Sequence, residues 1–403
     1  METNSYYDVD VQAWKKQLTV PSIIIKTEET SNALKNYKEY VLDVNGVKPV
    51  MRIDEKYNRL LLKGECDTNE FKSKYGLDND ISFYTVIIEP KARNYQEILR
   101  EALPEEDIVP GSFEVFGDIA IIYLKSKQLP YKYIIGKAIL VTHSKLKTVL
   151  NKTDKLDNVF RNPELELIAG EDKRETEVKE ESVKMKLNVG EVYFCTRLMS
   201  ERARVISTLS PKDVIVDVFC GIGPFALRAA KEKQCVVYAN DLNPKCYKYL
   251  NINRYLNRME DNIKSFCLDG RQFIKQISEM VSKGDIKQID HIYMNLPALS
   301  IEFLDAFRDF DFDSLPCEPV FHLYCFEELE DDENLVNEKV KARILESLDT
   351  KRENLGFIDF HSVKNVSLKK AYLCVTFRYL PYCKLSPNKK IENNTQNKKV
   401  KLV

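Results

Sequence analysis

A strand that runs into a glycine turn constrains this chain more than any other feature. The apolar, β-branched run Val214–Phe219 is followed by Gly221 and Gly223, and then by the helical stretch Phe225–Lys231. Three strand-like runs and two helical stretches alternate downstream: Val236–Ala239, Pro244–Asn257, Ile263–Cys267, Arg271–Val281 and His291–Met294. Such alternation indicates βαβ units and a parallel sheet. We therefore expect an α/β fold with a Rossmann-like, mostly parallel, doubly wound domain.

The rest of the chain predicts smaller α+β domains before that sheet and a short tail after it. We expect an N-terminal domain over 1–110, a middle domain over 111–205, the Rossmann-like domain over 206–385 and a basic, disordered tail over 386–403. The other expected strands are Val20–Ile25, Phe83–Ile88, the two halves of Phe113–Leu124 around Gly117, Val159–Gly170, Thr176–Val183, Phe321–Phe326 and Ala371–Arg378. The other expected helices are Arg93–Leu103, Tyr131–Lys147 and Ser200–Leu209, the last with Ser200 as its N-cap.

Composition excludes little. The 403 residues carry a net charge of −1, which does not exclude RNA, because one basic face is enough for binding. The 10 cysteines show neither CxxC pairs nor zinc-ligand spacing, so we expect reduced thiols and no metal site. No apolar run approaches the roughly 18 residues of a membrane span, and no signal peptide is evident. We expect no membrane association and a cytoplasmic location, with the nucleus and the mitochondrial matrix left open.

The glycine turn and the next strand form a candidate site for a nucleoside cofactor. Gly221 and Gly223 let the backbone approach a ligand, and the helix behind them begins with free N–H groups. Asp241, at the end of the next strand, can accept hydrogen bonds from both ribose hydroxyls. Because Gly221–Ala226 also fits the GxGxxA dinucleotide fingerprint, these features alone leave NAD and S-adenosylmethionine open.

Two further aspartates favour S-adenosylmethionine. Asp217 lies inside the first strand, where a carboxylate can take up the ammonium group of a methionine moiety and a dinucleotide needs no acid. Asp269 follows the third strand, where it can accept the exocyclic amine of adenine. Each aspartate alone is also consistent with a turn or cap residue, but three at successive strand ends indicate a site.

The segment Asn295-Leu-Pro297, after the fourth strand, indicates a second site, for a planar base. Proline keeps the chain extended and leaves nearby carbonyl groups outside the strand ladder. An amide with free carbonyls fits the N–H edge of a base, and a loop with an incidental asparagine is the alternative.

Together these motifs resemble the tRNA (guanine-37-N1)-methyltransferases of archaea and eukaryotes, which are class I, S-adenosylmethionine-dependent enzymes. The resemblance covers about residues 113–380, and the segments that carry it are Gly117–Ala120, Val159–Arg161, Glu166–Gly170, Phe194–Arg202, Asp217–Phe225, Asn240–Pro244 and Met294–Pro297. The chain departs from the family pattern at Cys220, where a small residue such as alanine is usual, and at Met199-Ser200, where a small residue and threonine are usual. Neither departure removes a chemical group that the resemblance requires.

The resemblance implies a role for each matching residue. Glu201 would be the general base for the guanine N1 proton, Arg161 would stabilise charge on O6, and Asn295 and Pro297 would hold the base. Arg197 and Arg202 would contact the substrate. Apart from the resemblance, the aromatic Tyr193 is a candidate to stack on the substrate base, with a core role as the alternative. The positions expected to bind the cofactor are Asp217, Phe219, Gly221, Gly223, Asp241, Leu242, Asp269, Gly270 and Asn295. The family also implies a monomer that contacts the anticodon loop of tRNA, with residues 1–110 docking on the elbow.

Three other functions remain open on the sequence. A wybutosine-pathway aminocarboxypropyl transferase would use the same cofactor. An NAD-dependent oxidoreductase would use the GxGxxA segment but would have no use for Asn295-Leu-Pro297. A non-catalytic RNA-binding protein would have a degenerate pocket, against which the intact aspartates argue.

Overall fold

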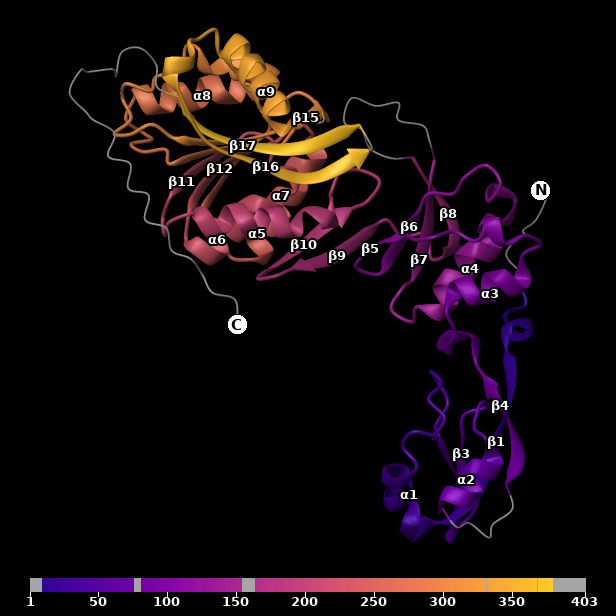
Figure 1. Cartoon of the computed structure of the whole chain (residues 1–403). Helices are drawn as coiled ribbons and strands as arrows, with labels where there is room; N and C mark the ends of the chain where they lie inside the picture. The colour runs from indigo at the N-terminus through magenta and orange to yellow at the C-terminus, as the bar shows by residue number, and fades with distance from the viewer. Residues whose placement is uncertain (1–8, 76–80, 154–163, 331, 368, 380–403) are drawn as a thin grey trace. The chain divides into compact units, whose positions relative to one another are not determined.

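The computed structural model describes residues 9–75, 81–153, 164–330, 332–367 and 369–379. The chain divides into two compact units, Met1–Thr176 and Glu177–Val403 (Figure 1). The finer division that the sequence predicts, with boundaries at 110, 205 and 385, stays a prediction. The expected tail over 386–403 and the segment Val159–Arg161 lie outside the described residues.

The first unit contains two four-stranded sheets, each packed with helices of its own. The strands of the antiparallel sheet β2-β3-β1-β4 are β1 (Lys16–Lys26), β2 (Val50–Arg52), β3 (Tyr57–Leu61) and β4 (Ser82–Ile88). The strands of the mixed sheet β5-β6-β7-β8 are β5 (Glu114–Phe116), β6 (Ile119–Ile122), β7 (Thr148–Lys152) and β8 (Leu165–Gly170). The helices are α1 (Thr30–Asn36), α2 (Thr68–Tyr75), α3 (Tyr95–Ala102) and α4 (Lys132–Thr142).

Most of the strands expected in this unit are confirmed, including the turn at Gly117, which has φ +56°. The helix predicted over Tyr131–Lys147 is wrong at its end. Helix α4 stops at Thr142, and a turn over residues 143–147 leads into β7 at Thr148, which pairs in parallel with β6 and antiparallel to β8. Pairing between strands, which local periodicity does not report, decides this boundary.

The second unit is built on a seven-stranded sheet in the order β13-β12-β11-β14-β15-β17-β16. The first five strands in that order run parallel, and β17 and β16 add an antiparallel edge. The strands are β11 (Val214–Asp217), β12 (Val236–Asn240), β13 (Ile263–Phe266), β14 (His291–Met294), β15 (Val320–Glu328), β16 (Leu355–Ser367) and β17 (Lys370–Tyr379). A hairpin of β9 (Glu175–Glu180) and β10 (Val183–Asn188) precedes this sheet in the chain.

Helices cover both faces of this sheet, with α8 and α9 on one face and α5, α6 and α7 on the other (Figure 1). They are α5 (Met199–Thr208), α6 (Pro224–Lys233), α7 (Pro244–Leu256), α8 (Gly270–Ser282) and α9 (Glu333–Leu348). The core under α8 and α9 joins Phe273 and Ile344 to Val216, Met294 and Val375 of the strands, all buried. The doubly wound sheet that the sequence predicts is therefore confirmed.

The main errors in this unit concern one cap and the elements after β14. Ser200 is not the N-cap of α5, because a short 3-10 helix, Thr196–Leu198, leads directly into the helix and leaves Leu198 in the capping position. Neither β16 nor α9 was expected from the sequence. Among the described residues, no helix is both long and apolar enough to cross a membrane.

Candidate functional site

The glycine turn between β11 and α6 leaves one side of the backbone open. Gly221 (φ +57°) and Gly223 (φ +88°) both adopt the left-handed conformation that favours glycine. A Cβ atom added to Gly223 would lie 2.5 Å from Leu250 Cδ1, whereas one added to Gly221 would meet only the carbonyl oxygen of Tyr193, at 3.9 Å. Packing therefore fills the space at Gly223, and a ligand has room to approach beside Gly221.

Asp241 ties this turn to the end of β12. Its Oδ2 accepts a hydrogen bond from the Gly221 N–H at 2.8 Å, and its Oδ1 accepts one from the Asn243 N–H at 2.9 Å. Burial raises the pKa of this carboxyl group. Each carboxylate oxygen can accept a second hydrogen bond, so Asp241 can still bind a pair of ligand hydroxyls.

Asp217, at the end of β11, is a deeply buried acid. Its side chain belongs to a residue that is only 1% exposed, and neither carboxylate oxygen is hydrogen-bonded within the part of the chain that the structure describes. Burial, and then the charge of Asp241, raise its pKa well above the usual value. Because an isolated buried carboxylate is costly, this acid fits a cationic ligand group better than an empty core position.

The end of β13 combines a helix-capping aspartate with an aromatic pair. Asp269 is the N-cap of α8, and its Oδ1 accepts a hydrogen bond from the Arg271 N–H at 2.9 Å. A Cβ atom added to Gly270 would lie within 3.0 Å of both Phe303 and Phe219, so a larger residue here would have to displace this aromatic pair. Leu242 is 50% exposed at the end of β12. These strand ends combine carboxylates, an aromatic pair and an exposed leucine, which suits a ligand with a charged end and an apolar ring.

Glu201, on α5, is a buried carboxylate that is contacted by three side chains. Arg204 comes from the same helix, and Tyr324 and His361 come from strands far along the chain. Its Oε1 accepts hydrogen bonds from Arg204 Nη2 at 2.8 Å and from the Tyr324 hydroxyl at 2.7 Å. Its Oε2 accepts one from Arg204 Nε at 2.8 Å and lies 3.3 Å from His361 Nε2. The pKa of Arg204 is raised above its usual value, mainly by these hydrogen bonds to Glu201. Glu201 is only 5% exposed, so its geometry is fixed by this set of contacts.

Asn295, directly after β14, belongs to the same network. The Tyr372 hydroxyl donates a hydrogen bond to Asn295 Oδ1 at 2.5 Å, and Asn295 Nδ2 donates one to the Tyr293 hydroxyl at 3.4 Å. The rings of Tyr372 and Tyr324 lie 5.5 Å apart, so continuous contacts join Asn295 to Glu201. The segment after Asn295 is anchored by the Pro297 carbonyl oxygen, which accepts a hydrogen bond from the Phe326 N–H at 3.1 Å.

The residues expected to contact the substrate have contrasting environments. Tyr193 and Arg197 are exposed, as an RNA contact requires. Arg202 is only 3% exposed, and its guanidinium donates to both carboxylate oxygens of Glu180 and to the Cys195 carbonyl oxygen. This environment indicates a structural role for Arg202, and its substrate contact stays a prediction. Arg161 lies outside the described residues.

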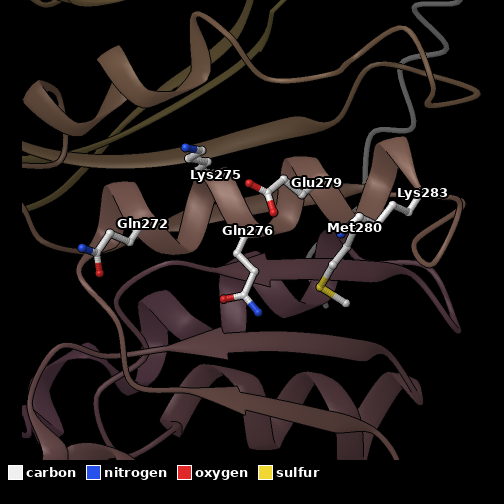
Figure 2. A pocket seen from close by; sticks show the side chains of 6 residues that line it. All are labelled: Gln272, Lys275, Gln276, Glu279, Met280 and Lys283. Carbon is white, nitrogen blue, oxygen red and sulfur yellow. The ribbon is translucent and has the colours of Figure 1, made fainter.

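A hollow on the outer surface of α8 is separate from this site. It has a volume of about 360 Å³ and is lined by five residues of that helix and by Lys283, which follows it; the five are Gln272, Lys275, Gln276, Glu279 and Met280 (Figure 2). Because no residue from the strand ends lines it, we do not assign the chemistry to it. In the part of the chain that the structure describes, no three His, Cys, Asp or Glu side chains are arranged to hold a metal ion.

Four residues of this site were missed by sequence reasoning: Arg204, Tyr324, His361 and Tyr372. Arg204 left one usable signal, because it lies three positions after Glu201, and residues at that spacing are neighbours on a helix. Nothing in the local sequence indicated the other three, since they come from β15, β16 and β17 and reach the site only through sheet pairing.

Comparison with known proteins places the chain in a family. Two family models match it, one described as the TRM5/TYW2 methyltransferase domain over residues 176–353 and one as the TYW2 N-terminal domain over residues 95–173. A protein of Dictyostelium discoideum named tRNA (guanine(37)-N(1))-methyltransferase is 36% identical to this chain, over 90% of the chain and 80% of the relative. The human protein of the same name is 32% identical, over 92% of the chain and 75% of the relative.

Solved structures agree with the observed fold. Trm5b from Pyrococcus abyssi has a TM-score of 0.64 at 25% identity, over 90% of this chain and 99% of that one. The aTrm5 protein, solved in complex with tRNALeu, has a TM-score of 0.68 at 24% identity, over 89% and 99%. The sequence matches and the shared Rossmann-like architecture together show that the chain belongs to the tRNA (guanine(37)-N(1))-methyltransferase family.

Proposed function

We propose that this chain transfers a methyl group from S-adenosylmethionine to N1 of guanosine 37 in tRNA. The observation that carries the proposal is the buried Glu201 carboxylate, which Arg204 and Tyr324 hold in one contact network with Asn295. A fixed carboxylate that is linked to a fixed amide through two packed tyrosines suits the removal of a ring N–H proton from a planar base. The names of the curated relatives support tRNA as the substrate and position 37 as the target.

The chemistry requires a base because guanine N1 keeps its proton at neutral pH. Glu201 is the proposed general base, and Arg161 is proposed to stabilise the negative charge that develops on O6. Asn295 and Pro297 would hold the flipped base, and the exposed Tyr193 ring would stack on it. S-adenosylmethionine, when bound, supplies the electrophilic methyl group.

Glu201 must lose one contact before it can accept this proton. A carboxylate offers about four acceptor sites, and Arg204, Tyr324 and His361 together occupy four positions around it. The contact with His361 is the longest, at 3.3 Å, and the His361 side chain is 38% exposed. We therefore expect the entering base to displace His361, while Arg204 and Tyr324 keep the carboxylate in place.

The cofactor is proposed to lie along the ends of β11, β12 and β13. Asp217 would take its ammonium group, Asp241 its ribose hydroxyls, and Asp269 its adenine amine, with Leu242 and Gly270 beside the ring. Phe219, Gly221, Gly223 and Asn295 would line the methionine part. The feature that best supports this placement is Asp217, whose carboxylate oxygens have no hydrogen-bond partner among the described residues.

The proposed partner is tRNA, bound at its anticodon loop by the second unit and at its elbow by residues 1–110. Arg197 is exposed and would contact the phosphate backbone, together with Arg202 if that side chain leaves its buried position. We propose that the protein acts as a monomer in the cytoplasm. The same activity would serve equally well in the nucleus or in the mitochondrial matrix.

The test of this function is a transfer assay with labelled S-adenosylmethionine. We expect label to enter unmodified tRNA that carries guanosine at position 37 and not the same tRNA with adenosine there. Equal labelling of both, or of neither, would contradict the proposal. The mass of the modified nucleoside separates a methyl group from an aminocarboxypropyl group, and tight binding of NAD would instead support the oxidoreductase.

Replacing Asp217 with asparagine tests the cofactor site. We expect the affinity for S-adenosylmethionine to fall about 10- to 100-fold, as for loss of a hydrogen bond to a charged group. The free energy of unfolding should not fall, because the carboxylate oxygens have no hydrogen-bond partner among the described residues. Calorimetric titration and urea unfolding measure the two effects. The control is Asp261→Asn, an exposed acid between α7 and β13. Unchanged affinity in Asp217→Asn would place the ammonium group elsewhere.

A further inference from the structure

The amide of Asn295 lies between two tyrosine hydroxyls, and the two distances differ. Oδ1 is 2.5 Å from the Tyr372 hydroxyl, and Nδ2 is 3.4 Å from the Tyr293 hydroxyl. Both tyrosines are buried, with Tyr372 on β17 and Tyr293 on β14. The amide is therefore oriented by groups that are themselves fixed.

These distances decide which end of the amide faces Tyr372. Hydrogen bonds between two oxygens span about 2.5–3.0 Å, whereas those from nitrogen to oxygen span about 2.7–3.2 Å. A reversed amide would put a nitrogen donor at the shorter distance and an oxygen pair at the longer one, and both would then fit worse. Burial also raises the pKa of Tyr372, so its hydroxyl keeps the proton that it donates to Asn295.

The orientation determines what Asn295 can offer a ligand. Its oxygen is engaged by Tyr372, and its –NH2 group has one proton directed to Tyr293 at a long distance and one for which the described residues provide no acceptor. Asn295 thus presents a donor. Among purines, O6 of guanine accepts a hydrogen bond, whereas adenine carries an amino donor at the corresponding position.

Tyr372 is well placed to keep the amide of Asn295 in this orientation. It is 3% exposed, and its ring packs between Tyr324 and Phe326, with ring centroids 5.5 Å away in both cases. Tyr324 is the residue that donates to Glu201. The packed aromatic rings on the neighbouring strands β15 and β17 therefore orient both the carboxylate of Glu201, which is the proposed general base, and the amide of Asn295.

We propose that Tyr372 is a positioning residue that fixes the amide of Asn295 as a hydrogen-bond donor toward O6 of a 6-oxopurine, and so contributes to the choice of guanine over adenine. This inference rests on the proposed function. It assigns no chemical step to Tyr372, which acts only through Asn295.

The test is a double-mutant cycle on the single-turnover rate of methyl transfer to tRNA with guanosine 37. Tyr372→Phe keeps the ring and removes the hydroxyl, and we expect the rate to fall about 3- to 10-fold, the size of one neutral hydrogen bond. In an Asn295→Ala background the same substitution should change the rate less than about 2-fold, because coupled residues are not additive. Tyr379→Phe is the control, since Tyr379 lies on the same strand beside Phe312.

A second pair of variants tests the donor assignment. Asn295→Asp keeps the shape and an acceptor for Tyr372 but loses the –NH2 group, so it should be at least as slow as Asn295→Ala. An Asn295→Asp enzyme that is faster than Asn295→Ala would overturn the donor role. An undiminished effect of Tyr372→Phe in the Asn295→Ala background would overturn the positioning role.

Folding and cofactor binding are checked by thermal melting and by titration with S-adenosylmethionine, and both should match the wild type in Tyr372→Phe. Loss of folding or of cofactor binding in that variant would show that Tyr372 serves the structure and overturn the inference. If the wild-type protein itself transfers no methyl group to guanosine 37, the proposed function fails instead, so the two failures are distinct.

Discussion

Replacing Glu201 with glutamine is expected to lower the single-turnover rate of methyl transfer by about 10²- to 10⁴-fold, the usual contribution of a general base. Glutamine has nearly the shape of glutamate but cannot take the N1 proton. The affinity for S-adenosylmethionine should change less than about 2-fold, because the contacts of Glu201 are with Arg204, Tyr324 and His361 rather than with the strand ends that carry Asp217 and Asp241. Rapid quench with labelled cofactor measures the rate, and titration measures the affinity.

A matched control removes a carboxylate charge far from this network. Glu338→Gln on α9 breaks an exposed ion pair with Arg352 and Lys341, and it should leave the rate unchanged. If cofactor affinity collapses in Glu201→Gln while the rate at saturating cofactor is preserved, Glu201 belongs to the cofactor site and another group removes the proton.

Much of the Rossmann-like sheet could be predicted because its signals are local. The predicted strand His291–Met294 coincides with β14, and the helices predicted at Phe225–Lys231 and Arg271–Val281 lie within α6 and α8. Short apolar runs bounded by glycine, asparagine and proline define these elements. The ends of parallel strands meet at one edge of a sheet, so the placement of Asp217 and Asp241 at one turn also followed from the order of elements.

The tyrosines that contact Glu201 and Asn295 could not be predicted for the opposite reason. Tyr324 is 123 positions from Glu201, and Tyr372 is 77 positions from Asn295. Their contacts depend on the antiparallel pairing of β15 with β17. In the sheet this pair comes after the parallel strands, so the strand direction reverses there. A tyrosine in an apolar strand has the pattern of an ordinary core residue, and only the three-dimensional structure shows what its hydroxyl meets.

Arg202 shows a second limit of sequence reasoning. Arg197, Arg202 and Arg204 are equally basic in sequence, but they have three different environments: Arg197 is exposed, Arg204 binds Glu201, and Arg202 is buried against Glu180. The helical spacing of Glu201 and Arg204 was visible, but the partner of Arg202 comes from β9, outside the helix.

That buried cluster is where the largest effect on stability is expected. Glu180 lies between Arg202 and Arg228, its side chain and both of theirs are only 4% exposed, and Arg228 also pairs with Glu232 on α6. Removing one member of a buried ion pair leaves an uncompensated charge and typically costs about 3–5 kcal/mol. We therefore expect Glu180→Ala to lower the free energy of unfolding by about that amount, because two buried guanidinium groups lose their shared carboxylate.

Urea unfolding measures this loss, and Glu177→Ala is the matched control. Glu177 lies on the same strand but faces solvent, where its 3.7 Å ion pair with Lys184 should contribute no more than about 1 kcal/mol. Because Arg202 directly follows Glu201 on α5, the cluster also anchors the helix that carries the proposed base. A Glu180→Ala protein as stable as Glu177→Ala would show that water or relaxation compensates the two arginines, and that α5 is held by its apolar contacts alone.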